Sequence, residues 1–431
     1  MPYSDRQMDG TISNSVLSDE AKRFVLERAS AIVGRRLAEI DLAPEVLRGM
    51  FHELSRAPEL ELQHRDSWGN WEFPYSIANL RGQLYTPWID APFQTLSGPK
   101  AMTSVWPEHR PFALCLTHDL DFITLQPSLS DCIRQIRRDV GLLLRRPRET
   151  SASAVVPRSL ARSAYLITTF RCFRPRRERT YDEWIRLEAK YGFHSTFFVF
   201  PERVIDPHPY DCLYSYRDAV RYEGRAIRVD AMLKEMSAAG WEIGLHGSYR
   251  SATEDGLLRD QRGQVERMVG ERVESTRQHW LHYRVDITPR LQAAAGLHQD
   301  STQGFNRNVG FRAGTAFPYA CWDHLNGTPF PVLEVPQHVM DGALFTTNAL
   351  EYDVDLAVRH CIHLMDEVEK VGGCLTLSWH PNSLQYDHYW ETYQLVLAEA
   401  SRRRAWGCSV RELSVHWANR MKSVGIQPVW V

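Results

Sequence analysis

The chain has 431 residues, 43% hydrophobic and 24% charged, with a formal net charge of −2. This length suits one large domain with an extension, and the near-zero charge argues against a nucleic-acid partner. No apolar run is long enough to span a bilayer, and the polar N-terminus lacks a signal-peptide pattern. We therefore expect a cytoplasmic protein whose 8 cysteines are reduced.

The first part of the chain is expected to precede the main domain. Residues 1–17 are polar and predict a disordered N-terminus. An extension follows over residues 18–107, where apolar periodicity predicts helices over Asp19–Ile40 and Pro44–Arg56. Asp66–Pro107 is rich in Trp, Pro, Gly and Tyr, which predicts an irregular segment anchored by aromatic side chains. These rings either pack over the domain or line a sugar cleft.

Residues 108–431 form the predicted main domain, and short continuous apolar runs within it are typical of strands buried on both faces. The runs are Phe112–Leu116, Ser195–Phe200, Trp241–Leu245, Val332–Val335 and Cys374–Ser378.

Helices are predicted between these strands. Thr180 and Glu183 have the spacing of a capping box that opens one helix, and Asp230 is expected to cap a second. Val354–Val371 is a third helix, and Tyr389–Arg402 is the last one expected. Strands that alternate with helices predict an α/β fold with a parallel sheet, either open or closed into a barrel.

A basic insertion is predicted at about residues 130–179, where RQIRRDVGLLLRRPRE and FRCFRPRRER concentrate positive charge. One interpretation is a solvated insertion with helical turns. The other is a surface that meets anionic lipid headgroups or a diphosphate-linked substrate, which would give the protein peripheral membrane contact.

Acids or histidines follow three of the predicted strands. Asp119 and Asp121 follow the first run, His246 the third and His380 the fifth, and α/β folds place catalytic groups at such strand ends. Asp119 and Asp121 are two residues apart, so on an extended strand they point the same way. Like charges so close share a proton or are held by a cation. An Asp and His set suits Zn²⁺ or a related divalent ion and fits hydrolysis of an amide or ester.

Four motifs, THDLD, EIGLHGSYRS, STRQHW and LTLSWHP, occur in this order. They resemble those of the polysaccharide deacetylases (the NodB-homology or carbohydrate esterase 4 group), and most closely the members encoded in bacterial surface-polysaccharide clusters. The resemblance covers about residues 111–400. It implies a distorted (β/α) barrel and one divalent metal, with zinc first and cobalt or manganese as alternatives.

The resemblance also implies roles for individual residues. Asp119 matches the catalytic base, Arg277 the arginine that holds it, and His380 the acid that protonates the leaving amine. Asp341 in VMDGALF is the candidate carboxylate that orients His380, although Asp-Gly is also an ordinary turn. Asp121 and His246 match metal ligands, and substrate-binding roles are predicted for His118, Tyr249, Arg312 and Trp379. A purely structural Arg312 is an equal alternative.

One position departs from the family pattern. The second histidine of the H-x3-H metal motif is Arg250 here, and an arginine cannot ligate a metal because it stays protonated. We nominate His279 as the third ligand, with His118 and His282 as weaker candidates. The alternative is a site that binds metal poorly or not at all.

The resulting hypothesis is a metal-dependent hydrolase that removes an N-acetyl group from an amino sugar of a bacterial surface polysaccharide or its precursor. Without an export signal, its carbohydrate substrate would be a lipid-linked or nucleotide-linked intermediate. The alternatives are a catalytically altered glycan-binding or assembly protein on the same fold, favoured by Arg250, and a hydrolase of a non-sugar amide. The sequence leaves the sugar, the acyl group and the oligomeric state open.

Overall fold

The computed structural model describes residues 16–61, 64–66, 69–71, 73–102, 105–123, 180–212 and 214–431. The predicted disorder of the N-terminus falls almost wholly on residues 1–15, and the basic insertion at about 130–179 also lies outside the described residues. Within the described ranges, no helix has the length and apolar character needed to cross a membrane.

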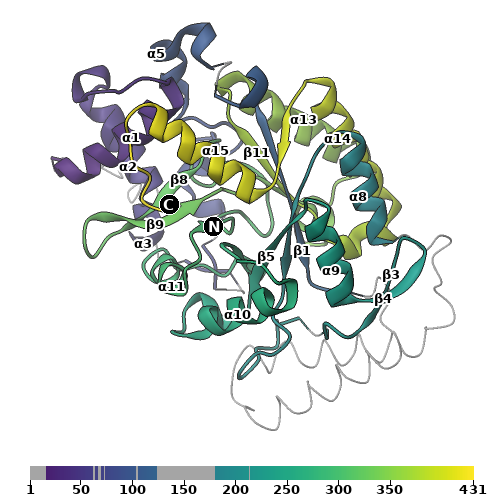
Figure 1. Cartoon of the computed structure of the whole chain (residues 1–431). Helices are drawn as coiled ribbons and strands as arrows, with labels where there is room; N and C mark the ends of the chain where they lie inside the picture. The colour runs from purple at the N-terminus through teal and green to yellow at the C-terminus, as the bar shows by residue number, and fades with distance from the viewer. Residues whose placement is uncertain are drawn as a thin grey trace, which may run out of the picture.

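The core is a ten-stranded sheet in the order β10-β11-β1-β2-β5-β6-β7-β9-β8, with β12 beside β1 (Figure 1). All pairs are parallel except β8–β9. The predicted α/β fold with a parallel sheet is confirmed. The strands are β1 Ala113–Leu120, β2 Thr196–Val199, β5 Glu242–Gly247, β6 Ser275–Gln278, β7 Gln299–Asp300, β8 Tyr319–Asp323, β9 Thr328–Glu334, β10 Val339–Met340, β11 Cys374–Ser378 and β12 Trp406–Cys408.

The sheet curls strongly, as expected for a distorted barrel. β6 is three strands away from β1, roughly 14 Å in a flat sheet, which exceeds the reach of an arginine side chain. Yet Arg277 on β6 donates hydrogen bonds to Thr117 Oγ1 on β1 at 2.8 Å and to Ser378 Oγ on β11 at 2.9 Å. The inner faces of these strands therefore face one another across a narrow interior. Among the described residues, β8 and β10 at the two ends of the order do not pair with each other, so the barrel is open.

Helices cover the outside of this sheet, and a small antiparallel hairpin projects beside them (Figure 1). Val354–Val371 forms the predicted helix α13, with its apolar stripe buried against the sheet. The hairpin pairs β3 Ala219–Tyr222 with β4 Arg225–Arg228. The other helices that follow β1 are α8 Tyr181–Lys190, α9 Val229–Ala238, α10 Leu257–Val269, α11 Thr288–Ala295, α12 Asp341–Phe345, α14 Asp387–Arg402 and α15 Val410–Ser423.

Several predicted helix ends were wrong. The first helix, α1, covers only Asp19–Val33, because Gly34 adopts a left-handed conformation with φ 81° and ends it. Thr180 is the N-cap residue of α8 as predicted, but the capping box does not form, because its side chain bonds Asp182. Asp230 lies in the first turn of α9, whose cap is Arg228. The last helix is α15, which opens with a true capping box between Ser409 and Glu412.

Helix α15 packs near the amino ends of the strands. The backbone N–H of Val410 donates to Thr196 Oγ1 at the start of β2. The next N–H, of Arg411, donates to the Glu242 carboxylate at the start of β5. Asp121 and His380 leave the opposite, carboxyl ends of the strands, and their side chains are 18% and 20% exposed.

The extension contributes α1, α2 Pro44–Leu54, α3 Ala57–Glu61, the short α4 Ile77–Leu80 and α5 Ala91–Met102. The last of these was not foreseen in the segment predicted to be irregular. Buried ion pairs join the extension to the loop at residues 310–318. Glu59 accepts from Arg312 at 2.6 and 2.9 Å and from Arg56 at 2.8 Å. Asp90 pairs with Arg28 at 3.0 Å and accepts from Thr315.

We expect Glu59→Gln to destabilise the fold by about 3–5 kcal/mol, because it leaves two buried arginines with weakened partners. Burial alone would raise the pKa of Glu59, but Arg312 and Arg56 outweigh burial and lower it to about 2. A carboxyl with a lowered folded-state pKa stabilises above its unfolded pKa and loses that contribution as pH falls. The difference between wild type and variant should therefore shrink from pH 5 towards pH 2 in denaturant titrations.

Glu235→Gln is the matched control, because Glu235 forms a surface pair with Arg225. Exposed pairs contribute about 0–1 kcal/mol, so this variant should unfold like wild type. Equal stability of both variants at pH 5 would contradict an anchoring role for Glu59.

Candidate metal centre and active site

The site begins at the carboxyl end of β1. The strand extends through Leu120, further than its apolar run, and its side chains alternate between the two faces. Thr117 and Asp119 therefore point into the barrel with Asp121 just beyond them, while His118 points out. Arg277 Nη1 lies 2.8 Å from Asp119 Oδ1, and both side chains are buried. Burial alone would raise the pKa of Asp119, but Arg277, together with His246 and His380, lowers it and keeps the carboxylate charged.

His246 and His279 meet Asp121 at one point. His246 Nε2 lies 3.2 Å from Asp121 Oδ1, and His279 Nδ1 lies 3.6 Å from the same oxygen. The two ring nitrogens are 2.9 Å apart. His246 ends β5, His279 follows β6, and these neighbouring strands bring the imidazoles to the same rim as β1.

The backbone sets which ring nitrogens face this point. His246 Nδ1 lies 2.9 Å from the Arg277 carbonyl, and His279 Nε2 lies 2.6 Å from the Tyr210 carbonyl. A carbonyl only accepts, so these two nitrogens carry hydrogens. The other nitrogen of each neutral ring then presents a lone pair, and the two lone pairs and Asp121 Oδ1 converge without a donor among them. Such an arrangement requires a proton or a cation at its centre.

The separations and the lowered pKa of His279 agree with a divalent cation. Two ligand atoms at the zinc–nitrogen distance of about 2.0–2.1 Å lie roughly 3.3 Å apart in a tetrahedral site, close to the observed 2.9–3.6 Å. Burial lowers the pKa of His279 to about 4, so this ring is neutral. Burial opposes a charge on His246 as well, but the neighbouring Asp119 and Asp121 raise its pKa. Within the described residues, these three side chains fit a metal ion.

Arg250 does not take part in this cluster. Its guanidinium lies 3.3 Å from Glu254 and 3.9 Å from Asp206, both on the surface side of the loop after β5. His279, which follows the next strand β6, lies beside Asp121 and His246 instead.

His380 faces the two aspartates from β11. Its Nδ1 lies 2.6 Å from Asp341 Oδ1, and its backbone N–H donates to Asp341 Oδ2 at 2.9 Å. The opposite nitrogen, Nε2, lies 3.6 Å from Asp121 and 3.9 Å from Asp119. Burial alone would lower the pKa of His380, but Asp341, then Asp121 and Asp119, raise it to about 10. A protonated imidazole held by a carboxylate therefore points at the mouth of the site.

Three residues predicted to bind substrate are placed elsewhere. His118 is fully buried outside the barrel, with its ring nitrogens 2.7 Å from the Trp379 carbonyl and Glu188. Trp379 is fully buried against Tyr393. Strand alternation sends both rings into the helix layer. Arg312 anchors the extension through Glu59, as described above. The substrate-binding predictions for these residues are corrected accordingly.

Tyr249 is only partly exposed, and both faces of its ring are covered. The rings of His208 and His282 stack on it at 4.2 and 4.1 Å, each tilted by 15°. Its ring therefore has no face left for stacking against a sugar. Trp280, directly after His279, instead exposes its indole at 37%.

Sequence reasoning missed two contributions from the loop between β2 and β3. Tyr210 supplies the carbonyl that orients His279, and Cys212 places its Sγ 3.6 Å from Asp121 Oδ1 and 3.8 Å from His279 Nε2. A backbone carbonyl leaves no trace in side-chain pattern, and the cysteine lies far from the recognisable motifs. Thr117, Ser378 and Ser301 around Arg277 did leave a signal, as small polar residues at or just after strand ends.

Comparisons with known proteins give fold-level similarity only. No family model and no curated protein matches the sequence. A Mycobacterium smegmatis protein assigned to the polysaccharide deacetylases aligns with 17% identity and a TM-score of 0.46, covering 75% of this chain and 94% of its own. The allantoinase Puue aligns with 14% identity and a TM-score of 0.44, and the alignment covers 73% of this chain and 92% of the allantoinase. A Pseudomonas aeruginosa PAO1 protein described as a probable polysaccharide deacetylase aligns with 12% identity and a TM-score of 0.43, and the alignment covers 73% of this chain and 93% of that protein. At these values the functional argument rests on the site itself.

We expect the purified protein to bind one divalent metal per chain, and Asp121→Ala and His279→Ala to lose it, because each removes one of three converging ligands. Elemental analysis after reconstitution with Zn²⁺, Co²⁺ or Mn²⁺ measures the stoichiometry. His282→Ala is the matched control, since His282 bonds the Tyr249 carbonyl outside the cluster. Full metal content in His279→Ala would show that the third ligand is another residue.

Proposed function

We propose that this protein is a metal-dependent hydrolase that removes an N-acetyl group from an amino sugar of a bacterial surface polysaccharide or its precursor. One observation carries the proposal: a charged, buried Asp119 and a protonated His380 flank the Asp121, His246 and His279 cluster. Base, acid and metal ligands are thus held within one small volume. Zinc is the proposed metal, because two imidazoles and a carboxylate are typical zinc ligands.

Asp119 is the proposed general base, which takes a proton from the attacking water. A base must be deprotonated and must keep a fixed orientation. Arg277 provides both properties, because its guanidinium holds Asp119 Oδ1 at 2.8 Å and lowers the pKa of the carboxyl. The remaining bonds of Arg277, to Ser301 O and Ser301 Oγ, fix the guanidinium plane.

His380 is the proposed general acid, which protonates the leaving nitrogen. Amide hydrolysis requires such a donor because an unprotonated amine is a poor leaving group. Asp341 holds Nδ1 and leaves Nε2 directed towards the aspartates, where the scissile bond would lie. Asp121, His246 and His279 would hold a divalent metal, which would supply Lewis-acid stabilisation of charge on the amide oxygen.

The sugar substrate is supported by two features beyond the motifs. Trp280 presents an exposed indole directly after His279, and flat apolar rings suit the faces of pyranoses. The extension supports this loop, because Asn70 donates to the Trp280 carbonyl at 2.7 Å. A lipid-linked or nucleotide-linked precursor is the form of the substrate that we propose.

We expect Asp119→Asn to reduce acetate release from N-acetylated amino-sugar oligomers by about 10²–10⁴-fold, the range for loss of a general base. Metal content should stay the same, because Asp119 is outside the ligand set. Asp286→Asn, at a surface pair with Arg284, is the control. Turnover at the wild-type rate in Asp119→Asn would disprove the base assignment. Wild type that binds no metal and releases no acetate would favour a glycan-binding protein instead.

Asp341→Asn should change the pH dependence as well as the rate. Asp341 is the largest cause that raises the pKa of His380 to about 10, so its loss lowers that pKa. The acid must be protonated, and protonation is lost as pH rises through the pKa. The alkaline limb of kcat/KM should therefore move to lower pH in the variant, with little change on the acidic limb. An alkaline limb at the wild-type pH would contradict the pairing.

A further inference from the structure

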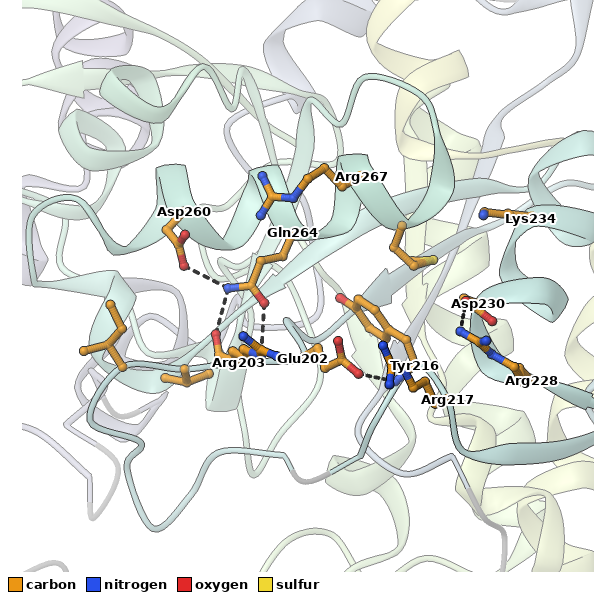
Figure 2. A pocket seen from close by; sticks show the side chains of 13 residues that line it. Glu202, Arg203, Tyr216, Arg217, Arg228, Asp230, Lys234, Asp260, Gln264 and Arg267 are labelled. Atoms are coloured by element: carbon orange, nitrogen blue, oxygen red, sulfur yellow. Dashed lines mark hydrogen bonds and ion pairs between the residues drawn. The ribbon is translucent and has the colours of Figure 1, made fainter.

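A second polar cavity lies next to the barrel, between the loop after β2, the β3–β4 hairpin, α9 and α10 (Figure 2). Its volume is about 570 Å³, within the range of about 300–1,000 Å³ that holds substrate-sized molecules. None of the residues assigned above to the metal centre lines it.

Cations dominate this cavity. The positively charged residues come from the loop between β2 and β3, the end of β4, α9 and α10, and they are Arg203, Arg217, Arg228, Lys234 and Arg267. In the part of the chain that the structure describes, only Arg228 among them forms an ion pair, with Asp230 at 2.5 Å. Like charges that outnumber the counter-charges around them repel one another, and an anion relieves that repulsion.

The carboxylates of the cavity are already engaged. Glu202 accepts from Ser215 Oγ at 2.7 Å and from the Tyr216 N–H at 3.2 Å. Asp260 accepts from Gln264 Nε2 at 2.8 Å. Together with Asp230 they bring three negative charges against five positive ones, so the lining is net positive by two.

The lining is also held in place before any ligand arrives. Gln264 on α10 accepts from the Arg203 N–H at 2.9 Å and donates to the Arg203 carbonyl at 2.8 Å (Figure 2). These two hydrogen bonds fix the loop after β2 against α10. Apolar Val204, Ile205 and Met268 complete the cavity, and Ile205 is 70% exposed. Such a wall suits an organic group attached to the anion.

We propose that this cavity binds the diphosphate group of a nucleotide-linked or lipid-linked ligand. A diphosphate matches four unpaired cations better than a single carboxylate does, because it presents several charged oxygens to Arg and Lys donors from different sides. The loop between β2 and β3 lines the cavity at residues 202–205 and also supplies the Tyr210 carbonyl that orients His279. The inference goes beyond the proposed hydrolysis, and binding tests it separately from turnover.

The first test is calorimetric titration of the full chain with inorganic pyrophosphate. The double variant Arg203→Ala/Arg267→Ala should bind about tenfold more weakly or worse, because two charge-assisted contacts are removed. Arg221→Ala is the matched control, since Arg221 is an exposed arginine of β3 outside the cavity. Equal affinity of the double variant and the control would overturn the proposal. Thermal unfolding at the wild-type temperature verifies that the exposed substitutions leave the fold intact.

Pyrophosphate also binds divalent metals, so the titration is repeated with Asp121→Ala. Retained binding there supports the cavity, whereas loss in Asp121→Ala alone assigns the anion to the metal centre and overturns the proposal. Sulfate that binds as tightly as pyrophosphate would likewise overturn it. Uridine diphosphate and geranyl diphosphate then separate the two sources of the group, because tighter binding of one identifies the attached nucleoside or lipid.

Discussion

The structure depends on a guanidinium buried at the centre of the barrel. Arg277 is fully buried and donates to Thr117, Asp119, Ser378 and twice to Ser301. Burying a charge costs several kcal/mol unless its donors are satisfied. That condition is met only if β1 and β11 curve towards β6, so the same buried guanidinium accompanies the curl of the sheet and keeps Asp119 ionised. The geometry around Asp119 is therefore part of the core and not an addition to it.

This polar interior explains which parts of the fold the sequence predicts. Strands β1, β2, β5 and β11 carry apolar residues and were found, because they bury side chains on both faces. Strand β6 reads Ser-Thr-Arg-Gln, yet all four residues are buried. Hydrophobic pattern cannot detect a strand whose inward face binds other polar groups. The antiparallel β8 was missed for a different reason, since its burial depends on the extension packed over it.

The site was predictable where chemistry and strand ends coincide. The predicted metal ligands and catalytic candidates converge as expected: Asp119, Asp121, His246, His279, Arg277, His380 and Asp341. The predictions for His118 and Trp379 were wrong because a residue beside a motif can face either side of a strand. A shift of one position along the strand reverses the face. The substrate-binding prediction for Arg312 was wrong because its partner, Glu59, lies over 250 positions earlier in the sequence. Long-range ion pairs of this kind follow from the fold and not from local sequence.

The loop between β2 and β3 connects the two polar regions of the molecule. Its first residues are bonded to α10 through Gln264, and its middle positions His279 through the Tyr210 carbonyl. The lone pair that His279 offers to a cation exists only while that carbonyl accepts from the opposite nitrogen. Gln264 already holds the beginning of this loop against α10, so the loop approaches the rim of the barrel from a fixed position.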